Sequence, residues 1–209
     1  KSLEEENTYF LVWTTTPWTL PSNVALCMNP NETYCKLTHD GKNYIMLEKL
    51  VPTLFEEGSF EIVYSKKGKA FEFHKYQPLF DYAKDSVKKG YFVIVDDYVT
   101  TEDGTGIVHI APAFGEDDYN ACKKYDIDFV QLVDESGNMS EKTDFGGLFV
   151  KDADKHIIKK LEEEDKMFKV LPFEHSYPHC WRCKSPLLYY AKDTWFIKTT
   201  AYKDKLVDN

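Results

Sequence analysis

Short hydrophobic runs alternate with turn-forming residues along the first 110 positions of the chain. β-branched and aromatic residues dominate these runs, and this composition is typical of strands. The runs lie at 8–16, 24–28, 44–48, 60–64, 70–74, 91–95 and 107–110. Turns such as Asp40-Gly41 and Asp103-Gly104 separate them, and long helical patterns do not occur in this half. The front half is therefore predicted to be antiparallel or mixed β-structure.

Helical periodicity appears at 50–56 and 117–125 and is clearest at 152–165. In the last of these, apolar residues recur at the spacing of one helix face. They are Ala153, Ile157, Ile158 and Leu161. Together with the strands, these helices predict an α+β fold rich in β-structure, with a mixed or antiparallel sheet core and a few flanking helices.

A change in composition near residue 170 predicts a subdomain boundary. Residues 1–170 hold the predicted strands and helices and form the core. Residues 171–209 contain three prolines and a Cys-x2-Cys pair at Cys180 and Cys183. Because proline favours extended and turn conformations, we expect this second part to be an extended β-ribbon with a cysteine knuckle.

Composition limits the class of partner. The 209 residues include 26 Lys and Arg against 35 Asp and Glu, so the formal net charge is −9. A basic surface that coats nucleic acid without regard to sequence is thereby excluded. Arg182 is the one arginine in the chain. Phosphate contacts would therefore use Lys, hydroxyl or backbone N–H groups rather than bidentate guanidinium clamps.

The sequence also indicates the kind of cellular compartment in which the protein is found. Mean hydropathy is −0.48, and no run approaches the roughly 18 apolar residues of a membrane helix. Five cysteines, an odd and sparse set, favour a reducing compartment. The chain begins with Lys1 and an acidic run, unlike a secretory signal. We expect a piece of a longer, cytoplasmic protein.

The segment 13–23 has the most unusual composition in the chain, Trp-Thr-Thr-Thr-Pro-Trp-Thr-Leu-Pro-Ser-Asn. A proline cannot donate to a strand ladder, so the strand should stop at the three threonines. Strand alternation would place Thr14 and Thr16 on one face and Thr15 on the other. Hydroxyl groups at a strand end beside Trp18 can hold a polar ligand or a water molecule. Alternatively, the threonines are ordinary strand residues and the tryptophan belongs to the core.

A second candidate segment, 104–119, combines Gly-x-Gly, a histidine and an acidic triplet. The Gly-x-Gly leads into a strand, so the dinucleotide-binding fingerprint does not apply. His109 lies near the end of that strand, and Asp118 falls in the first turn of the next predicted helix. An imidazole and a carboxylate at one corner can bind an ammonium group, position water or act as acid and base. Alternatively, the acidic residues only stabilise the helix N-terminus and His109 is a hydrogen-bonded core residue.

Cys180 and Cys183 have the spacing of one half of a zinc site. A structural zinc needs four ligands, and His175 and His179 would complete an awkward tetrahedron within so short a stretch. A second Cys pair elsewhere in a longer parent protein is the favoured completion, with unliganded thiols as the alternative. We therefore predict no complete metal site within the chain.

In their order along the chain and in their residues, these segments resemble the editing insertion, or connective peptide 1 (CP1) domain, of isoleucyl-tRNA synthetases. The resemblance spans nearly the whole chain. It rests on Thr-Thr-Thr-Pro-Trp-Thr-Leu-Pro-Ser-Asn at 14–23, Gly-Thr-Gly-Ile-Val-His-Ile-Ala-Pro at 104–112, Gly-Glu-Asp-Asp at 115–118 and Tyr-Pro-His-Cys-Trp-Arg-Cys-Lys at 177–184. Valyl and leucyl relatives share the fold, but their threonine motif continues with Arg-Pro rather than Pro-Trp. Phe114 and the stretch 152–155 look like the eukaryote-type branch, which implies a cytosolic parent.

The resemblance implies a barrel-like editing-domain core and a stem that leads back to the synthetic core. It implies hydrolysis of valine misattached to tRNA(Ile), with valyl adenylate as an additional candidate substrate. One missing methylene changes binding by only about 1–3 kcal/mol, and isoleucine against valine in this enzyme class is the standard example of that limit. The implied partners are the tRNA(Ile) acceptor end and the rest of the synthetase, with no membrane and a monomeric fragment. No cofactor is implied for editing, and zinc only as a structural ion of the parent.

The resemblance also implies catalytic roles. Asp118 would hold the α-ammonium group of the misattached residue, because a carboxylate offsets the desolvation of that cation. Thr14 and Thr16 would orient the ester carbonyl and the attacking water. An internal threonine lacks the free amine that activates an N-terminal threonine nucleophile, so direct attack by water is the simpler mechanism.

Substrate-binding roles follow from the same resemblance. His109 would limit the pocket so that valine enters and isoleucine does not. Thr15 and Asn23 would support the terminal adenosine, and Trp18 would pack against the terminal nucleotide or the pocket wall. Two other interpretations stay open: a valyl- or leucyl-type editing domain, and a non-catalytic module that binds an aminoacyl-adenosine or a tRNA end.

Overall fold

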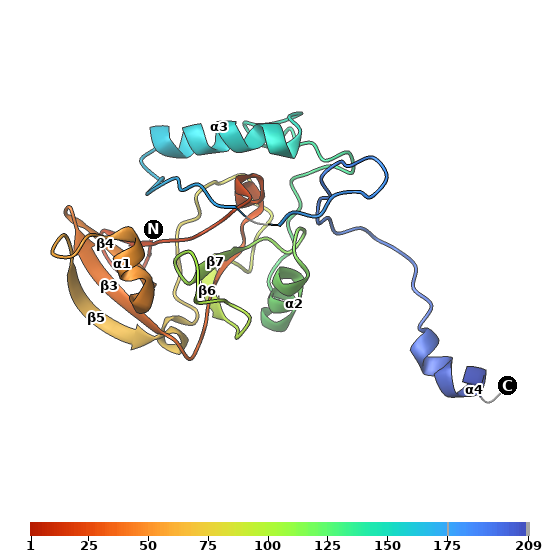
Figure 1. The fold of residues 1–209 in the computed structure, drawn as a ribbon, viewed down its shortest axis with the longest axis horizontal. Coiled ribbons are helices and arrows are strands. Elements are labelled where there is room, and N and C mark those ends of the chain that lie inside the picture. Colours follow the sequence, from red (N-terminus) through yellow and green to blue (C-terminus); the bar gives the residue numbers. More distant parts are fainter. Residues whose placement is uncertain (175, 208–209) are drawn as a thin grey trace.

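The computed structural model describes residues 1–174 and 176–207. Within that part of the chain the strands form two separate sheets, with orders β1-β4-β3-β5 and β6-β2-β7 (Figure 1). The strands are β1 (Thr8–Phe10), β2 (Ala25–Met28), β3 (Thr33–His39), β4 (Lys42–Leu47), β5 (Glu61–Lys67), β6 (Phe92–Val95) and β7 (Ile107–Ile110). The α-helices are α1 (Val51–Leu54), α2 (Glu116–Tyr125), α3 (Val150–Glu163) and α4 (Lys203–Val207). The 3-10 helices are η1 (Pro17–Ser22), η2 (Glu48–Leu50), η3 (Gly68–Phe71) and η4 (Thr199–Tyr202).

Both sheets are mixed. β1 pairs with β4 and β2 with β6 in parallel, whereas β3 and β7 pair with their neighbours in antiparallel fashion. The predicted β-rich α+β class with mixed sheets is confirmed. The barrel-like core is not seen in closed form, because the two sheets stay open and separate over the residues that the structure describes.

The hairpin of β3 and β4 shows what the sequence pattern missed. Asp40 and Gly41 both have positive φ, 47° and 75°, which is the geometry of a two-residue hairpin turn whose twist matches the strands. The hydrophobic run predicted β4 but not β3, because polar residues interrupt β3 while Tyr34, Cys35 and Leu37 are fully buried. The sequence TYCKLTH therefore becomes an inner strand of its sheet only through packing.

The strand predicted at 70–74 is wrong. The chain instead forms η3 up to Phe71, and Phe73 adopts a left-handed backbone conformation, with φ 68°. Phe71 is fully buried in the core, so it reflects burial in a turn rather than strand pairing, whereas Phe73 is exposed. The predicted strand 8–16 is likewise shortened to β1, although Trp13 still bridges Val108 of β7.

The second sheet lies at the centre of the molecule. All four residues of β2 are buried, as expected for a strand covered on both faces. One face packs against the first sheet, and the other packs against α2. The phenol of Tyr34 in β3 donates a 2.6 Å hydrogen bond to the carbonyl of Gly106, just before β7. This bond ties the two sheets together at the base of the strand that carries His109.

Helix α3 covers η1. Its predicted apolar face is buried through Ala153, Ile157 and Leu161, which pack in one cluster with Trp18 and Leu20 of η1. Figure 1 shows α3 directly above the red segment that contains η1. The helix therefore fixes the position of the chain that follows the three threonines.

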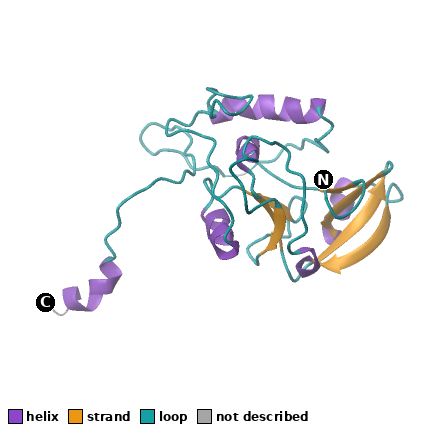
Figure 2. Ribbon diagram, turned by 180° about the vertical axis from the view of Figure 1, so that it is seen from behind, coloured by secondary structure: helices purple, strands orange, loops and turns teal. Residues whose placement is uncertain are grey.

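The chain after α3 runs back across the body of the molecule and then leaves it. Residues 166–171 line a cavity described below. Further on, the N–H of Ala191 donates to the carbonyl of Ala113 at 2.8 Å, and beyond this point the chain extends away from the core (Figures 1 and 2). The boundary near residue 170 stays a prediction. None of the helices in the described ranges is long and apolar enough to cross a membrane.

Candidate functional site

The threonine segment begins beside β7 but does not form a regular strand. The N–H of Trp13 donates to the carbonyl of Ile107 at 3.2 Å, and the next residues turn away. The hydroxyl of Thr14 accepts the N–H of Thr16 at 3.1 Å, a local bond typical of a turn. The predicted alternation of faces is therefore wrong, because Thr14, Thr15 and Thr16 all line one cavity.

His109 is buried in β7, and its ring is held by a residue of η1. The imidazole Nε2 lies 2.9 Å from the hydroxyl of Thr19, and that hydroxyl also donates to the carbonyl of Thr16 at 2.8 Å. Since a hydroxyl has one proton to give, Nε2 carries the proton in the His109–Thr19 bond. The other nitrogen, Nδ1, is then a buried acceptor with no hydrogen-bond partner among the residues that are described.

The charge of His109 follows from its burial. Desolvation lowers the pKa of the imidazole to about 4. The ring is consequently neutral across the physiological range. A neutral ring presents one donor and one acceptor rather than a positive charge.

Asp118 closes the corner between β7 and α2. Its Oδ2 accepts the N–H of Ala111 at 2.9 Å, and its Oδ1 lies 3.5 Å from the hydroxyl of Tyr98. Burial raises the pKa of Asp118 to about 6, against a smaller lowering by the Ala111 N–H. The carboxylate bonds back across the loop and makes no cap hydrogen bond at the start of α2 in the described structure. At neutral pH it is a largely ionised, partly desolvated anion.

These two segments meet in a cavity of about 260 Å³, here called the small cavity. Its lining joins the three threonines and Thr19 to His109 and Asp118, with apolar walls around them. The apolar and aromatic wall residues are Trp13, Val108, Ala111 and Phe114. Residues almost a hundred positions apart in the sequence therefore share one concave site that offers hydroxyl groups, a neutral imidazole and a carboxylate.

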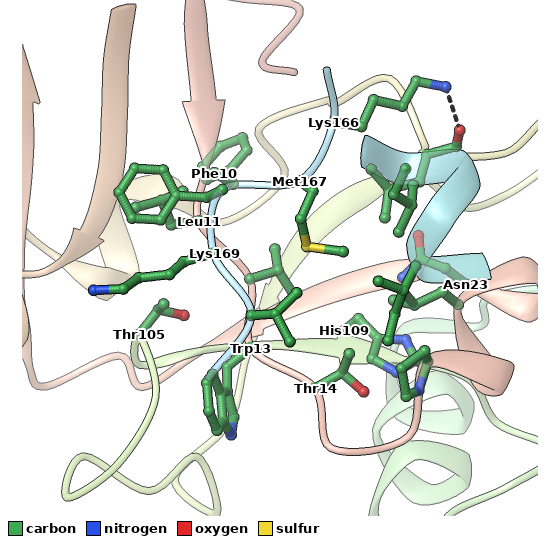
Figure 3. Close-up of a pocket in the computed structure, with 18 of the residues that line it drawn as sticks. Phe10, Leu11, Trp13, Thr14, Asn23, Thr105, His109, Lys166, Met167 and Lys169 are labelled. Atoms are coloured by element: carbon green, nitrogen blue, oxygen red, sulfur yellow. Dashed lines mark hydrogen bonds between the residues drawn. The ribbon is translucent and has the colours of Figure 1, made fainter. Parts of the chain in front are cut away.

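A larger cavity of about 410 Å³ adjoins it, here called the large cavity. Trp13, Thr14, Thr15 and His109 line both cavities. Figure 3 shows Thr14 and His109 on one side of the large cavity, with Met167 projecting into it from the chain that follows α3. The threonine segment and His109 thus form part of the lining of both cavities.

Asn23 and Trp18 occupy different surroundings. Asn23 lines the large cavity, where its amide donates to the carbonyl of Ala25 and accepts the hydroxyl of Tyr76. Trp18 is 3% exposed and packs edge-on against Phe114 at 4.9 Å between ring centroids. It lies in the core, outside the lining of both cavities as the described residues define them. Its ring partner Phe114 does line the small cavity.

The cysteine pair lies in a turn far along the chain. The N–H of Cys180 donates to the carbonyl of Ser185, and the pKa of Cys183 is lowered to about 7, chiefly by the Ser185 hydroxyl. Both thiols are free. In 1–174 and 176–207, no group of three or more His, Cys, Asp or Glu residues is placed to hold a metal ion. His175 lies outside the described residues.

The fold defines the class of protein. GlLeuRS-CP1 matches with a TM-score of 0.63 at 16% identity, covering 81% of this chain and 87% of that one. The editing domain of the P. falciparum cytosolic leucyl-tRNA synthetase matches with a TM-score of 0.58 at 15% identity, covering 77% and 78%. The chain has the fold of aminoacyl-tRNA synthetase editing domains.

Sequence similarity narrows the class to one region of one enzyme family. The isoleucine–tRNA ligase of Clostridium acetobutylicum is 47% identical over 206 residues, which are 98% of this chain and 20% of that protein. That of Bacillus thuringiensis strain Al Hakam is 46% identical over 207 residues, 99% and 20% respectively. No protein-family model matches the chain. The chain thus corresponds to the editing-domain region of isoleucine–tRNA ligases and spans about a fifth of the relatives' length.

This comparison supports one expectation drawn from the sequence but not a second one. The isoleucyl resemblance agrees with the relatives found. The eukaryote-type assignment is not shown, since the relatives named above are bacterial, and it stays a prediction.

Two residues of the site are not predicted from the sequence. Thr19 belongs to the threonine motif, and its spacing of three residues from Thr16 suits one helical turn. Asp154 of α3 accepts the N–H of Trp18 at 2.8 Å and lines the large cavity. No local signal indicates this contact, because 136 positions separate the two residues.

Proposed function

We propose that this chain is the proofreading domain of an isoleucine–tRNA ligase and hydrolyses the ester that joins valine to mischarged tRNA(Ile). The small cavity carries the proposal: Asp118, His109 and the threonine segment converge on a space of about 260 Å³. A carboxylate, a neutral size-limiting ring and several hydroxyl groups are the features that recognition of a small aminoacyl ester requires.

Asp118 holds the α-ammonium group of the misattached amino acid. Its Oδ1 makes only a long, 3.5 Å contact with Tyr98, so this oxygen has capacity for a stronger partner. Burial that is unfavourable for the carboxylate alone becomes favourable when a cation binds beside it. This pairing orients the substrate by its charged end.

His109 sets the size limit. The ring is buried and fixed by Thr19, so it forms a firm wall rather than a mobile side chain. Valine is accommodated, whereas the extra methylene of isoleucine meets the ring. The synthetic site gains only about 1–3 kcal/mol from that methylene, and a second, smaller site supplies the remaining discrimination.

Water is the nucleophile. It attacks the ester carbonyl, the carbonyl–oxygen bond to the ribose breaks, and valine and a free ribose hydroxyl are the products. Thr14 and Thr16 orient the carbonyl and the water, because both line the small cavity near the fixed ring. None of the threonines needs to form a covalent intermediate. The adenylate of valine is a second candidate substrate of the same pocket.

The large cavity receives the terminal nucleoside of the tRNA. Thr15 and Asn23 line it, and its shared wall with the small cavity lets one molecule occupy both. Trp18 supports the wall of the small cavity from the core through Phe114. The net charge of −9 suits a domain to which the rest of the synthetase delivers the tRNA end. In this proposal the parent enzyme is cytoplasmic, and the isolated chain is a monomer.

Editing itself uses no cofactor in this proposal, and Cys180 and Cys183 form half of a structural zinc site completed elsewhere in the parent. Zinc analysis of the purified parent enzyme tests this point. One equivalent should be lost in the Cys180→Ala, Cys183→Ala double variant, whereas equal zinc content in both proteins would contradict the assignment.

The decisive experiment is a deacylation assay with the full-length synthetase. We expect release of valine from Val-tRNA(Ile) and little release of isoleucine from Ile-tRNA(Ile). Asp118→Ala should abolish the first reaction, and Asp117→Ala, at an exposed neighbouring position, should retain it. Preference for another mischarged tRNA would indicate valyl- or leucyl-type editing. Binding of a non-hydrolysable aminoacyl-adenosine analogue without hydrolysis of any substrate would indicate a binding module.

A further inference from the structure

Helix η1 begins in an unusual way. Its first residue, Pro17, has no N–H, so the N–H of Trp18 is the first free donor of the turn. The preceding residue, Thr16, makes no side-chain cap bond within the described structure. The acceptor comes instead from α3, where Oδ1 of Asp154 lies 2.8 Å from the backbone nitrogen of Trp18. The side chain of Asp154, which is remote in sequence, therefore takes the place of a local helix cap.

Helix η1 carries the groups that hold His109. The N–H and the hydroxyl of Thr19 both donate to the carbonyl of Thr16, at 3.1 and 2.8 Å. The same hydroxyl accepts Nε2–H of His109 at 2.9 Å. Thr16 and Thr19 therefore move as a unit with the first turn of η1. A displacement of that turn shifts a cavity-lining threonine and the imidazole together.

Asp154 is well placed to anchor this turn. Its neighbours Ala153 and Ile157 are fully buried against η1, so the helix that presents the carboxylate is itself fixed. An anion at the N-terminal end of a helical turn is favourably placed. Burial raises the pKa of Asp154 to about 6, with the Trp18 N–H lowering it in part, so the group is mostly ionised at neutral pH. Asp152, two residues earlier on α3, is exposed.

We propose that Asp154 is a positioning residue of the editing site, which holds the start of η1 and thereby sets where Thr16, Thr19 and His109 stand in the small cavity. The role rests on the proposed function. Asp154 itself does not line the small cavity as the described residues outline it. It acts through the backbone of Trp18, which makes the hydrogen-bond acceptor, rather than the negative charge, the required feature.

The test uses the full-length synthetase with three substitutions: Asp154→Ala, Asp154→Asn and the control Asp152→Ala. Asparagine keeps an oxygen that can accept the Trp18 N–H. We expect Asp154→Ala to lower kcat for Val-tRNA(Ile) hydrolysis by about 10- to 100-fold, because small misplacements of reacting groups have effects of that size. KM should stay within about twofold. Asp154→Asn should regain most of the rate, and Asp152→Ala should match wild type.

A second measurement does not depend on activity. Amide hydrogen exchange over residues 17–23 should be faster in Asp154→Ala than in wild type, and unchanged in Asp154→Asn and Asp152→Ala. Wild-type kcat and exchange in Asp154→Ala would overturn the proposal. Equal loss of kcat in the Ala and Asn variants would also overturn it, since the charge would then be the important feature. If the wild-type enzyme itself spares Val-tRNA(Ile), the proposed function fails, and the exchange data alone decide whether Asp154 anchors η1.

Discussion

The hydroxyl of Thr19 lies 2.9 Å from Nε2 of His109, although the two residues are 90 positions apart in the chain. This contact joins the threonine segment to the strand that ends at the second motif. It fixes both the orientation and the tautomer of the ring, and it leaves Nδ1 as a buried acceptor without a partner among the described residues.

Replacement of Thr19 by valine, which is nearly the same size, removes that acceptor. A buried Nε2–H left without a partner costs about 1–3 kcal/mol, and the ring loses its fixed orientation. We expect hydrolysis of Val-tRNA(Ile) by the full-length enzyme to slow by about 10-fold or more. Thr19→Ser keeps the hydroxyl and should stay close to wild type. Equal rates in the valine and serine variants would show that the hydrogen bond is irrelevant to editing.

The pH dependence of editing should follow Asp118 rather than His109. Only the ionised carboxylate holds an ammonium group, and its pKa is about 6, so kcat/KM should fall as the pH drops below 6. The His109 pKa is about 4, so its ring stays neutral down to about pH 5 and adds no inflection near 6.5. Rates for Val-tRNA(Ile) from pH 5 to 7 give the profile. An inflection at 6.5 that disappears in His109→Gln would contradict this assignment.

His109 should also make the stability of the fold depend on pH. Its folded pKa of about 4 lies below the value of about 6.5 for an unfolded histidine. The unfolded state therefore takes up a proton first, and stability is lost as the pH falls from about 6.5 to about 4. Asp118 has the opposite sign, because its raised pKa makes the folded state bind a proton first between about pH 6 and 4.

The two effects separate in variants. Urea unfolding of wild type and His109→Gln at pH 7 and pH 5 isolates the histidine. We expect the stability advantage of the wild type to shrink by about 1–2 kcal/mol between these pH values. A difference that stays constant with pH would mean that the ring is not buried in neutral form.

Gly106 is needed for both its backbone conformation and its missing side chain. Its φ is +72°, and an added Cβ would lie 2.5 Å from Cβ of Leu47 in the first sheet. Gly41 in the β3–β4 turn has a similar φ of +75° but open space around it, which makes it a matched control. We expect Gly41→Ala to lower the free energy of unfolding by about 1 kcal/mol, and Gly106→Ala to lower it by about 1–3 kcal/mol more. Similar losses measured by urea unfolding would mean that the sheets tolerate the contact.

Much of the local structure could be predicted from the sequence. Helix α3 was recognisable because Ala153, Ile157 and Leu161 recur at helical spacing, and the burial of that face follows from the same periodicity. The corner from His109 to Asp118 was also predictable, since a strand, a short loop and an acidic helix start are encoded within a few residues. The expected strand 8–16, by contrast, ends at Phe10, well before Pro17, so the proline is not what ends it.

The remaining features depended on contacts between distant residues. Strand β3 is an inner strand because β4 and β5 pair with it on either side, and its own polar residues do not indicate this position. The alternation expected for Thr14 to Thr16 failed because the hydroxyl of Thr14 bonds back to the chain and turns it. Local propensity has little influence where such a bond or a buried partner determines the path.

By itself, the sequence determined helix α3, the strand-to-helix corner between His109 and Asp118, several turns and the chemical groups available in each motif. Those properties depend on neighbours along the chain, whose conformational preferences act over a few residues. Only the tertiary structure decided that Thr19 meets His109, that Asp154 meets Trp18, and that two motifs share one cavity. These contacts depend on how buried faces pack together, and that packing is a collective property of the whole core rather than of any one segment.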